Sequence, residues 1–268
     1  MQLYADSVFY NITLHQADRK LPYLLMFHGF MGSREVFKPL IDDLAGFCNP
    51  LTIDLIGHGK TITPDNPELF HAERQIQQLK SVLDRLQCKP LYLFGYSMGG
   101  RLAFQLIARH SGLFAGAIIE SSHCGIYSKT DRTNRIEADQ QRAIKIENNF
   151  TDFHQKWQQL PLFAHTPFKA RKRYTKIMKT QKPELMSASL KGFGAGVMPN
   201  VCQKIHLSHL PLQLIAGGRD KKYAEIMEQM SGNHKNSKLA VVKNAGHRVH
   251  TDRPEEWIRI VKDFMQTG

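Results

Sequence analysis

The segment from Pro90 to Arg101 constrains the fold of this chain more than any other. It begins with a short apolar run, continues as Gly95-Tyr96-Ser97-Met98-Gly99, and leads into a helix-like stretch that ends near His110. A serine hydroxyl is a poor nucleophile unless a sharp turn holds it out of regular structure, and small residues two before and two after it let the backbone make that turn. The pattern therefore predicts a nucleophilic serine, Ser97, between a strand and a helix.

Short apolar runs alternate with helical segments along most of the chain. The later runs are too continuously apolar for a sheet with one wet face, so they indicate parallel strands covered on both sides. Alternation of this kind predicts an α/β fold with a doubly wound, mostly parallel sheet. The expected strands are 9–14, 23–28, 51–55, 91–96, 115–120, 212–217 and 239–242, and the expected core helices are 36–44, 74–86, 99–110, 222–230 and 254–266.

The alternation breaks between about Gly125 and Ile205. This stretch has helical periodicity and many charges but no convincing strand, and it predicts one long helix over 131–145 and shorter ones over 150–158, 168–178 and 183–192. A helical excursion between two core strands is typical of a cap over the strand ends. We therefore expect a core of residues 1–124 and 206–268 with a helical cap of residues 125–205.

Two residues further along the chain complete the chemistry that a serine nucleophile needs. A histidine must accept the serine proton, and a carboxylate must fix the tautomer of that histidine. In folds with this turn, the serine comes first in the chain, then the acid, then the histidine. Asp220 follows an apolar strand that opens into a Gly-rich turn, and His247 follows another strand that ends in Ala245-Gly246. We predict a catalytic triad of Ser97, Asp220 and His247.

A second turn, Phe27-His28-Gly29-Phe30, also follows an apolar run. A developing oxyanion needs N–H donors, and a glycine lets the backbone approach closely. The expected donors are the backbone N–H groups of Phe30 and Met98. The His28 side chain is interpreted as structural, and His58 is interpreted as holding its loop by a hydrogen bond.

Together these motifs resemble the α/β-hydrolase superfamily over essentially the whole chain. A narrower resemblance rests on Gly95–Arg101, on Glu120-Ser-Ser, and on the cap segment from Arg132 to Gln140. These segments are similar to the 2-succinyl-6-hydroxy-2,4-cyclohexadiene-1-carboxylate synthases of menaquinone and phylloquinone biosynthesis. Residues 157–163 and 187–196 look like the cap of that family.

The narrower resemblance implies a carbon–oxygen lyase. Its reaction would eliminate pyruvate from 2-succinyl-5-enolpyruvyl-6-hydroxy-3-cyclohexene-1-carboxylate, with Ser97 removing a ring proton after activation by His247. An oxyanion hole suits this reaction, because a proton taken next to a carbonyl leaves negative charge on oxygen. The substrate carries several carboxylates, so the resemblance also implies cationic contacts.

The same resemblance implies five substrate-binding residues. Arg101, directly behind the serine, and Arg135, in the cap, are implied to hold substrate carboxylates. Trp157 is expected to line the pocket with its N–H, and Tyr96 is expected to donate its hydroxyl to the substrate. The chain departs from the family pattern at one place, where another cap arginine is typical and this chain has Lys179. Lysine keeps the positive charge but loses the bidentate fork.

Two other functions stay open. The same machinery would serve a serine hydrolase, either a carboxylesterase or a C–C bond hydrolase, and water incorporation into the product would reveal it. A non-catalytic binding protein on this scaffold would lack a member of the triad, and none is missing from this sequence.

Composition sets the remaining expectations. The formal net charge is +12, yet the positive residues are spread along the chain without a nucleic-acid-binding module, so we expect a small anionic substrate rather than nucleic acid. No apolar run approaches the ~20 residues that cross a bilayer, which predicts no membrane association. The N-terminus lacks the pattern of a signal peptide, which favours a cytoplasmic protein.

The four cysteines, Cys48, Cys88, Cys124 and Cys202, are scattered without a C-x-x-C pair. This spacing predicts reduced, mostly buried thiols rather than disulfides or a metal site. No dinucleotide-binding or metal-binding motif occurs, so we expect neither a cofactor nor a metal. We expect a monomer or a weak homo-oligomer.

Overall fold

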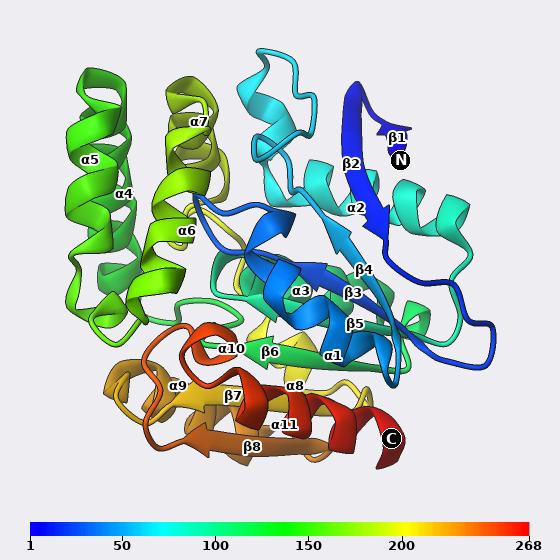
Figure 1. Ribbon diagram of the computed structural model, residues 1–268. Coiled ribbons are helices and arrows are strands. Elements are labelled where there is room, and N and C mark those ends of the chain that lie inside the picture. Colours follow the sequence, from blue (N-terminus) through cyan, green and yellow to red (C-terminus); the bar gives the residue numbers. More distant parts are fainter. Residues whose placement is uncertain (268) are drawn as a thin grey trace.

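Eight strands form one sheet in the computed structural model, which describes residues 1–267 (Figure 1). Their order across the sheet is β1-β2-β4-β3-β5-β6-β7-β8. β1 and β2 pair antiparallel, β2 and β4 pair antiparallel, and all other neighbours are parallel. The strands are β1 (Gln2–Ala5), β2 (Val8–Leu14), β3 (Tyr23–Phe27), β4 (Asn49–Ile53), β5 (Leu91–Tyr96), β6 (Gly116–Glu120), β7 (Leu212–Gly217) and β8 (Ser237–Val242).

Every residue of β4, β5, β6 and β7 is buried, as continuous apolar runs predict for strands covered on both faces. The predicted doubly wound α/β fold is therefore confirmed. The strand β1 was not predicted, because an apolar run of only three residues, Leu3–Ala5, is too short to mark a strand.

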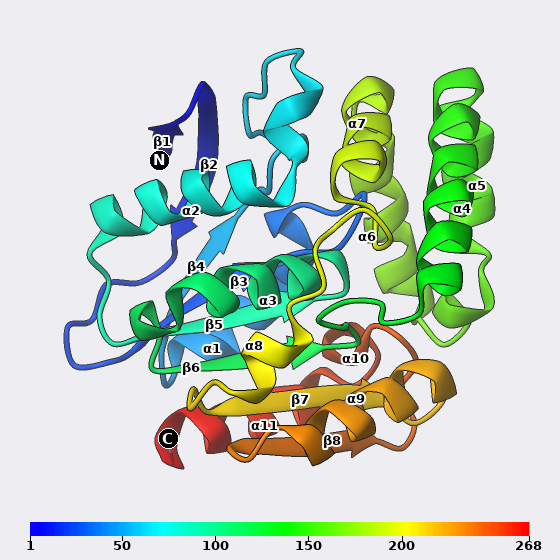
Figure 2. The same cartoon turned by 180° about the vertical axis from the view of Figure 1, so that it is seen from behind.

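Helices cover both faces of the sheet. α1 (Ile41–Ala45) and α11 (Pro254–Thr267) lie on one face (Figure 1), whereas α2 (Ala72–Leu86), α3 (Met98–His110), α8 (Cys202–His206) and α9 (Lys221–Asn233) lie on the other (Figure 2). α10 (Val249–Asp252) is a single turn after β8. Four short 3-10 helices occur as well, at Arg34–Leu40, Pro67–Phe70, Ser111–Leu113 and Pro161–Phe163.

Four helices stand beyond the carboxyl ends of the parallel strands, at the left of Figure 1. They are α4 (Lys129–Asn148), α5 (Phe150–Gln158), α6 (Phe168–Lys179) and α7 (Pro183–Phe193). The hydroxyl of Ser128 caps the first of them by accepting from the Asp131 N–H at 3.2 Å. The chain forms these helices as one group after it leaves β6 and before it enters β7. We therefore propose a division into a core of residues 1–124 and 206–268 and a cap of residues 125–205.

The prediction of four reduced cysteines is wrong for one pair. Cys124 and Cys202 form a disulfide with their Cα atoms 4.9 Å apart, while Cys48 and Cys88 are free. The two bridged residues are 78 positions apart, so no local spacing reveals the pair. They meet because the chain enters and leaves the cap at one place, where the Val201 N–H donates to the Cys124 carbonyl at 3.0 Å.

Within residues 1–267, no helix is both long enough and apolar enough to cross a membrane. The same part of the chain holds no group of three or more His, Cys, Asp or Glu side chains placed to bind a metal ion.

Candidate active site

The predicted turn at Ser97 lies between β5 and α3. Ser97 has φ 53° and ψ −111°, a strained backbone conformation for a residue with a side chain. The flanking glycines make this turn possible. A Cβ atom on Gly95 would lie 2.7 Å from the Gly100 Cα, and one on Gly99 would lie 2.5 Å from the carbonyl oxygens of Phe27 and His28. The turn therefore exposes the serine hydroxyl at the carboxyl edge of the sheet.

Three side chains predicted from separate motifs meet at this edge. The Nε2 atom of His247 lies 3.1 Å from the Ser97 hydroxyl oxygen, and its Nδ1 atom lies 2.6 Å from the Asp220 carboxylate. A carboxylate only accepts hydrogen bonds, so Nδ1 carries the proton and Nε2 is free to accept the serine proton. This arrangement can activate the serine as a nucleophile or as a base.

Aromatic rings hold the imidazole of His247 in place. The ring of Tyr223 lies 4.7 Å from it, that of Tyr96 lies 5.5 Å away, and that of Phe163 lies 6.0 Å away, each measured between centroids. Phe163 belongs to the cap, and the neighbouring Leu162 carbonyl accepts from the His247 N–H at 3.3 Å. The cap therefore touches the catalytic loop directly.

The two expected oxyanion donors flank the serine. Met98 begins α3, so its N–H has no helical acceptor, and the N–H of Phe30 follows Gly29, which packs against Tyr96 and Ser97. Within residues 1–267 neither amide donates to another protein group. Both amides are available to a negatively charged oxygen.

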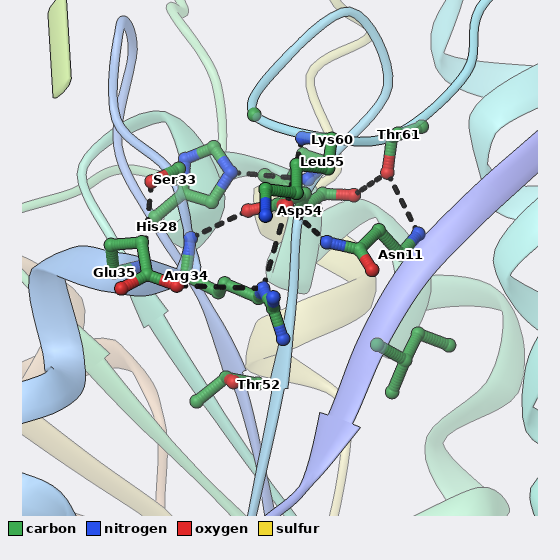
Figure 3. A network of polar contacts seen from close by, with 12 residues as sticks. Asn11, His28, Ser33, Arg34, Glu35, Thr52, Asp54, Leu55, Lys60 and Thr61 are labelled. Atoms are coloured by element: carbon green, nitrogen blue, oxygen red, sulfur yellow. Dashed lines mark hydrogen bonds and ion pairs between the residues drawn. The ribbon is translucent and has the colours of Figure 1, made fainter. Parts of the chain in front are cut away.

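A buried polar network supports the loop that carries Phe30 (Figure 3). Asp54 accepts from the Arg34 N–H at 2.7 Å, the Lys60 N–H at 2.9 Å and the Asn11 amide at 2.8 Å. His28 accepts from the Leu55 N–H at 3.1 Å, so its other ring nitrogen donates to the Gly29 carbonyl at 2.8 Å. These two contacts give His28 a structural role, as the sequence indicated.

His58 lies beside this network. Its Nδ1 atom donates to the Ile56 carbonyl at 2.8 Å, and its Nε2 atom is buried without a partner. Burial, reinforced by the neighbouring His28, lowers the pKa of His58 to about 3. Its ring is therefore neutral at physiological pH, and it packs against the rings of His28 and Phe30.

A small cavity of about 30 Å³ opens at the serine. Tyr96 and Trp157, both predicted substrate-binding residues, are among its walls, and Trp157 packs edge-on against Phe30. The volume accommodates about one water molecule. The cavity is lined by Gly29, Phe30, Gly32, Val36, Tyr96, Ser97, Trp157, Phe163, Tyr174 and Arg248.

A larger cavity of about 470 Å³ lies on the other side of Tyr223. Arg135 and Lys222 line it, as do the bridged Cys124 and Cys202. The Nε atom of Arg135 donates to Asp139 at 2.8 Å, which orients the guanidinium. One aromatic side chain, that of Tyr223, contacts both this cavity and the ring of His247.

Two predicted substrate-binding residues line neither cavity. Arg101 is buried beneath the cap, where its Nη1 atom donates to the Phe193 carbonyl at 2.9 Å. Burial, with repulsion from Arg135, lowers the pKa of Arg101 to about 10. Lys179 is exposed at the end of α6. Among the cavities at the serine and beyond it, the structure brings Tyr96 and Trp157 to the serine and Arg135 to the larger cavity, and it brings Arg101 and Lys179 to neither.

Sequence reasoning did not single out Arg248, the residue directly after His247, which lines the cavity at the serine. Its guanidinium lies 3.8 Å from the ring centroids of both Phe163 and Tyr174, and the residue is 3% exposed. The only signal in the sequence is its position next to His247, which does not reveal burial.

Comparison with known proteins shows what this chain resembles. A 2-succinyl-6-hydroxy-2,4-cyclohexadiene-1-carboxylate synthase of Salmonella typhimurium is 26% identical over 87% of this chain and 89% of its own length. A Bacillus subtilis protein that carries the same name provisionally is 29% identical over 89% of this chain and 88% of its own. The structure of MenH from S. aureus, with 26% identity, superposes with a TM-score of 0.90 over 96% of this chain and 98% of that one.

The profile of the alpha/beta hydrolase family matches residues 24–260. This range includes the serine turn, Asp220, His247 and the whole cap. The chain belongs to the alpha/beta hydrolase family.

Proposed function

We propose that this protein is a carbon–oxygen lyase, a 2-succinyl-6-hydroxy-2,4-cyclohexadiene-1-carboxylate synthase of menaquinone biosynthesis. The observation that carries the proposal is the likeness to relatives of that name, which extends over the core and the cap alike. The contact between His247 and Ser97 adds a base that this reaction can use.

In the proposed reaction Ser97 removes a ring proton while His247 accepts the serine proton. The C–H bond breaks, a ring C=C bond forms, and the C–O bond to the enolpyruvyl group breaks. Enolpyruvate leaves and becomes pyruvate after protonation on carbon. Asp220 stabilises the imidazolium that His247 becomes, because it accepts from Nδ1 at 2.6 Å.

The proton that leaves is next to a carbonyl group, so negative charge develops on the carbonyl oxygen. The free N–H groups of Phe30 and Met98 are suited to stabilise that charge, because they are fixed before the substrate binds. Removal of one such donor typically slows an enzyme by about 10²- to 10³-fold.

The substrate of this reaction is a small molecule with several carboxylates. Arg135 is proposed as one cation for them, since Asp139 holds its Nε and leaves its two Nη groups for a ligand. Arg101 is proposed to act behind the serine by holding the Phe193 carbonyl of the cap. The overall charge of +12 favours the approach of such an anion.

A cavity of about 30 Å³ is too small for this substrate, because small-molecule pockets usually enclose about 300–1,000 Å³. Trp157 and Phe163 close the cavity from the cap side. Entry of the substrate therefore requires that these two side chains move away from Phe30 and Arg248.

The decisive experiment follows pyruvate release together with the absorbance of the conjugated diene. We expect the wild-type protein to form both products in equal amounts and the Ser97→Ala variant to lose activity by about 10⁴-fold or more. Ser111→Ala, a substitution just after α3, is the control and keeps full activity. Absence of pyruvate release from the enolpyruvyl substrate would refute the lyase. Turnover of ester or diketone substrates with incorporation of water would identify a hydrolase instead.

A further inference from the structure

The side chain of Arg248 is buried in the wall of the serine cavity without a carboxylate partner. Among residues 1–267 no Asp or Glu oxygen lies within 4 Å of its nitrogen atoms, and its Nε has no hydrogen-bond partner. By contrast, the buried carboxylate of Asp54 near this site accepts hydrogen bonds from the Arg34 and Lys60 N–H groups. A buried cation without a counter-ion is costly, and its presence in the wall of the serine cavity points to a ligand that pairs with it.

Each of the two neighbouring carboxylates, Glu120 and Asp252, has a partner other than Arg248, although the Oδ1 atom of Asp252 has none among residues 1–267. Glu120 lies 2.7 Å from the Nδ1 atom of His250, and both residues are fully buried. Asp252 accepts from the Gly246 N–H at 2.8 Å, and burial raises the pKa of its carboxyl group. Neither carboxylate forms an ion pair with Arg248.

Aromatic rings fix the orientation of the guanidinium. Phe163 and Tyr174 each lie 3.8 Å from its central carbon, so both rings cover the planar group and leave the donors at its edge. The hydroxyl of Tyr174 contacts the Nε2 atom of His250 at 3.0 Å, which ties that ring to Glu120. The chain of contacts from Glu120 through His250 to the Tyr174 hydroxyl therefore holds one of the two rings that pack against the guanidinium.

The cavity that Arg248 lines is the cavity of Ser97. A planar guanidinium with its faces covered presents paired N–H donors along its edge, and paired donors match the two oxygens of a carboxylate. Because Arg248 directly follows His247, its backbone position is set by the same loop that places the catalytic imidazole. An anionic group bound there would be held beside the reacting atoms.

From these observations we infer that Arg248 is a specificity-determining residue that binds a substrate carboxylate beside Ser97. The assignment rests on the proposed function for the identity of the substrate. The class of ligand, a carboxylate held bidentately, does not depend on the proposed function.

The inference also explains which parts of the cap respond to the ligand. Phe163 and Tyr174 both come from the cap, whereas Arg248 comes from the core. A carboxylate that neutralises the arginine removes the cost of burying it between these rings. Substrate binding therefore favours the closed position of the cap.

The test measures binding without turnover. Succinate, and its uncharged analogue succinamide, are titrated into wild-type and Arg248→Met protein by isothermal calorimetry. Methionine keeps an unbranched apolar stem between the two rings while it removes the charge. We expect succinate to bind the wild type at least 10-fold more tightly than the variant, and succinamide to show no such difference. Arg248→Lys restores part of the succinate affinity.

Arg253→Met is the matched control. Arg253 lies five positions after Arg248 on the same connection, but it is half-exposed and paired with Glu256. Equal succinate affinity in wild type and Arg248→Met, or no saturable succinate binding by the wild type, would overturn the assignment. A purely structural arginine would lower the melting temperature of Arg248→Met without changing the ratio of succinate to succinamide affinity.

The kinetic arm separates this inference from the proposed function. With the enolpyruvyl substrate, Arg248→Met is expected to lower kcat/KM by 10²-fold or more, and mainly through KM. If the wild type releases no pyruvate but binds succinate in an Arg248-dependent way, the lyase fails and the carboxylate site stands. If pyruvate is released equally by wild type and Arg248→Met, the site fails and the lyase stands.

Discussion

The Nε2 atom of His247 lies 3.1 Å from the Ser97 hydroxyl although 150 residues separate the two positions. Ser97 follows β5 and His247 follows β8, and two strands, β6 and β7, lie between β5 and β8 in the sheet. The loop after β8 therefore has to reach back across the carboxyl edge of the sheet. The contact of the His247 N–H with the Leu162 carbonyl of the cap supports the loop in that position.

Asp220→Asn is expected to lower kcat by about 10³- to 10⁴-fold while it leaves the fold unchanged. The amide can donate to Nδ1, which would place the proton of His247 on Nε2, the atom that must accept from Ser97. The measurement is steady-state pyruvate release, compared with Asp263→Asn on the outer surface of α11. Retention of more than a tenth of the wild-type rate would contradict the assigned tautomer.

Gly99→Ala is expected to destabilise the protein by about 3 kcal/mol or more, because overpacking against backbone cannot relax. The added Cβ would lie 2.5 Å from the carbonyl oxygens of Phe27 and His28. Gly232→Ala in α9 is the control, since nothing lies within 4 Å of its added Cβ. Alanine there should stabilise the helix by about 0.5–1 kcal/mol. Urea unfolding of both variants measures these changes. Equal stability of Gly99→Ala and Gly232→Ala would refute the prediction.

Cys202→Ser is expected to destabilise the protein by up to about 4 kcal/mol, because the 78-residue loop between Cys124 and Cys202 is no longer closed in the unfolded chain. Thiol labelling under non-reducing conditions should modify two cysteines in the denatured wild type, Cys48 and Cys88. Labelling of four would show that the bridge is absent in solution.

His58→Gln is expected to weaken the pH dependence of stability between about pH 6.5 and pH 3. The folded protein holds the pKa of His58 at about 3, below its ordinary value of 6.5, so the unfolded chain binds more protons in this window. The free energy of unfolding therefore falls as the pH falls, by up to about 1.4 kcal/mol per pH unit for one such group.

Urea unfolding at pH 7 and pH 5 measures that slope for wild type and variant. Loss of the bond to the Ile56 carbonyl will lower stability at both pH values, so the comparison uses the difference between them. An unchanged slope would show that His58 is not the buried neutral group described above.

The core elements were predictable because local patterns encode them. Continuous apolar runs marked β5 and β7 to the residue, and helical periodicity marked α5 over its full length. The short α8 and α10 were missed, because a single turn of helix has too few residues to show periodicity. The disulfide was missed because its partners meet only through the path of the cap.

The triad motifs could also be read from the chain, because each follows a strand and parallel strands end at one edge. The positively charged residues proposed to bind the substrate could not be predicted from such motifs. Lys179, a substrate-binding residue that the resemblance implies, is exposed and lines neither cavity, whereas Arg248 belongs to no motif and lines the cavity at the serine. The direction of a long side chain depends on what packs around it, and Phe163 and Tyr174 reach Arg248 from another part of the chain.

The amino-acid sequence by itself determined the strands, the cap helices and the residues that follow each strand, since backbone propensity and hydrophobic period act over a few neighbours. The tertiary structure alone decided how far the cap closes, which cysteines pair, and which arginine is buried at the serine. Those outcomes depend on contacts between segments tens of residues apart, where burial and charge are set by packing rather than by any local pattern.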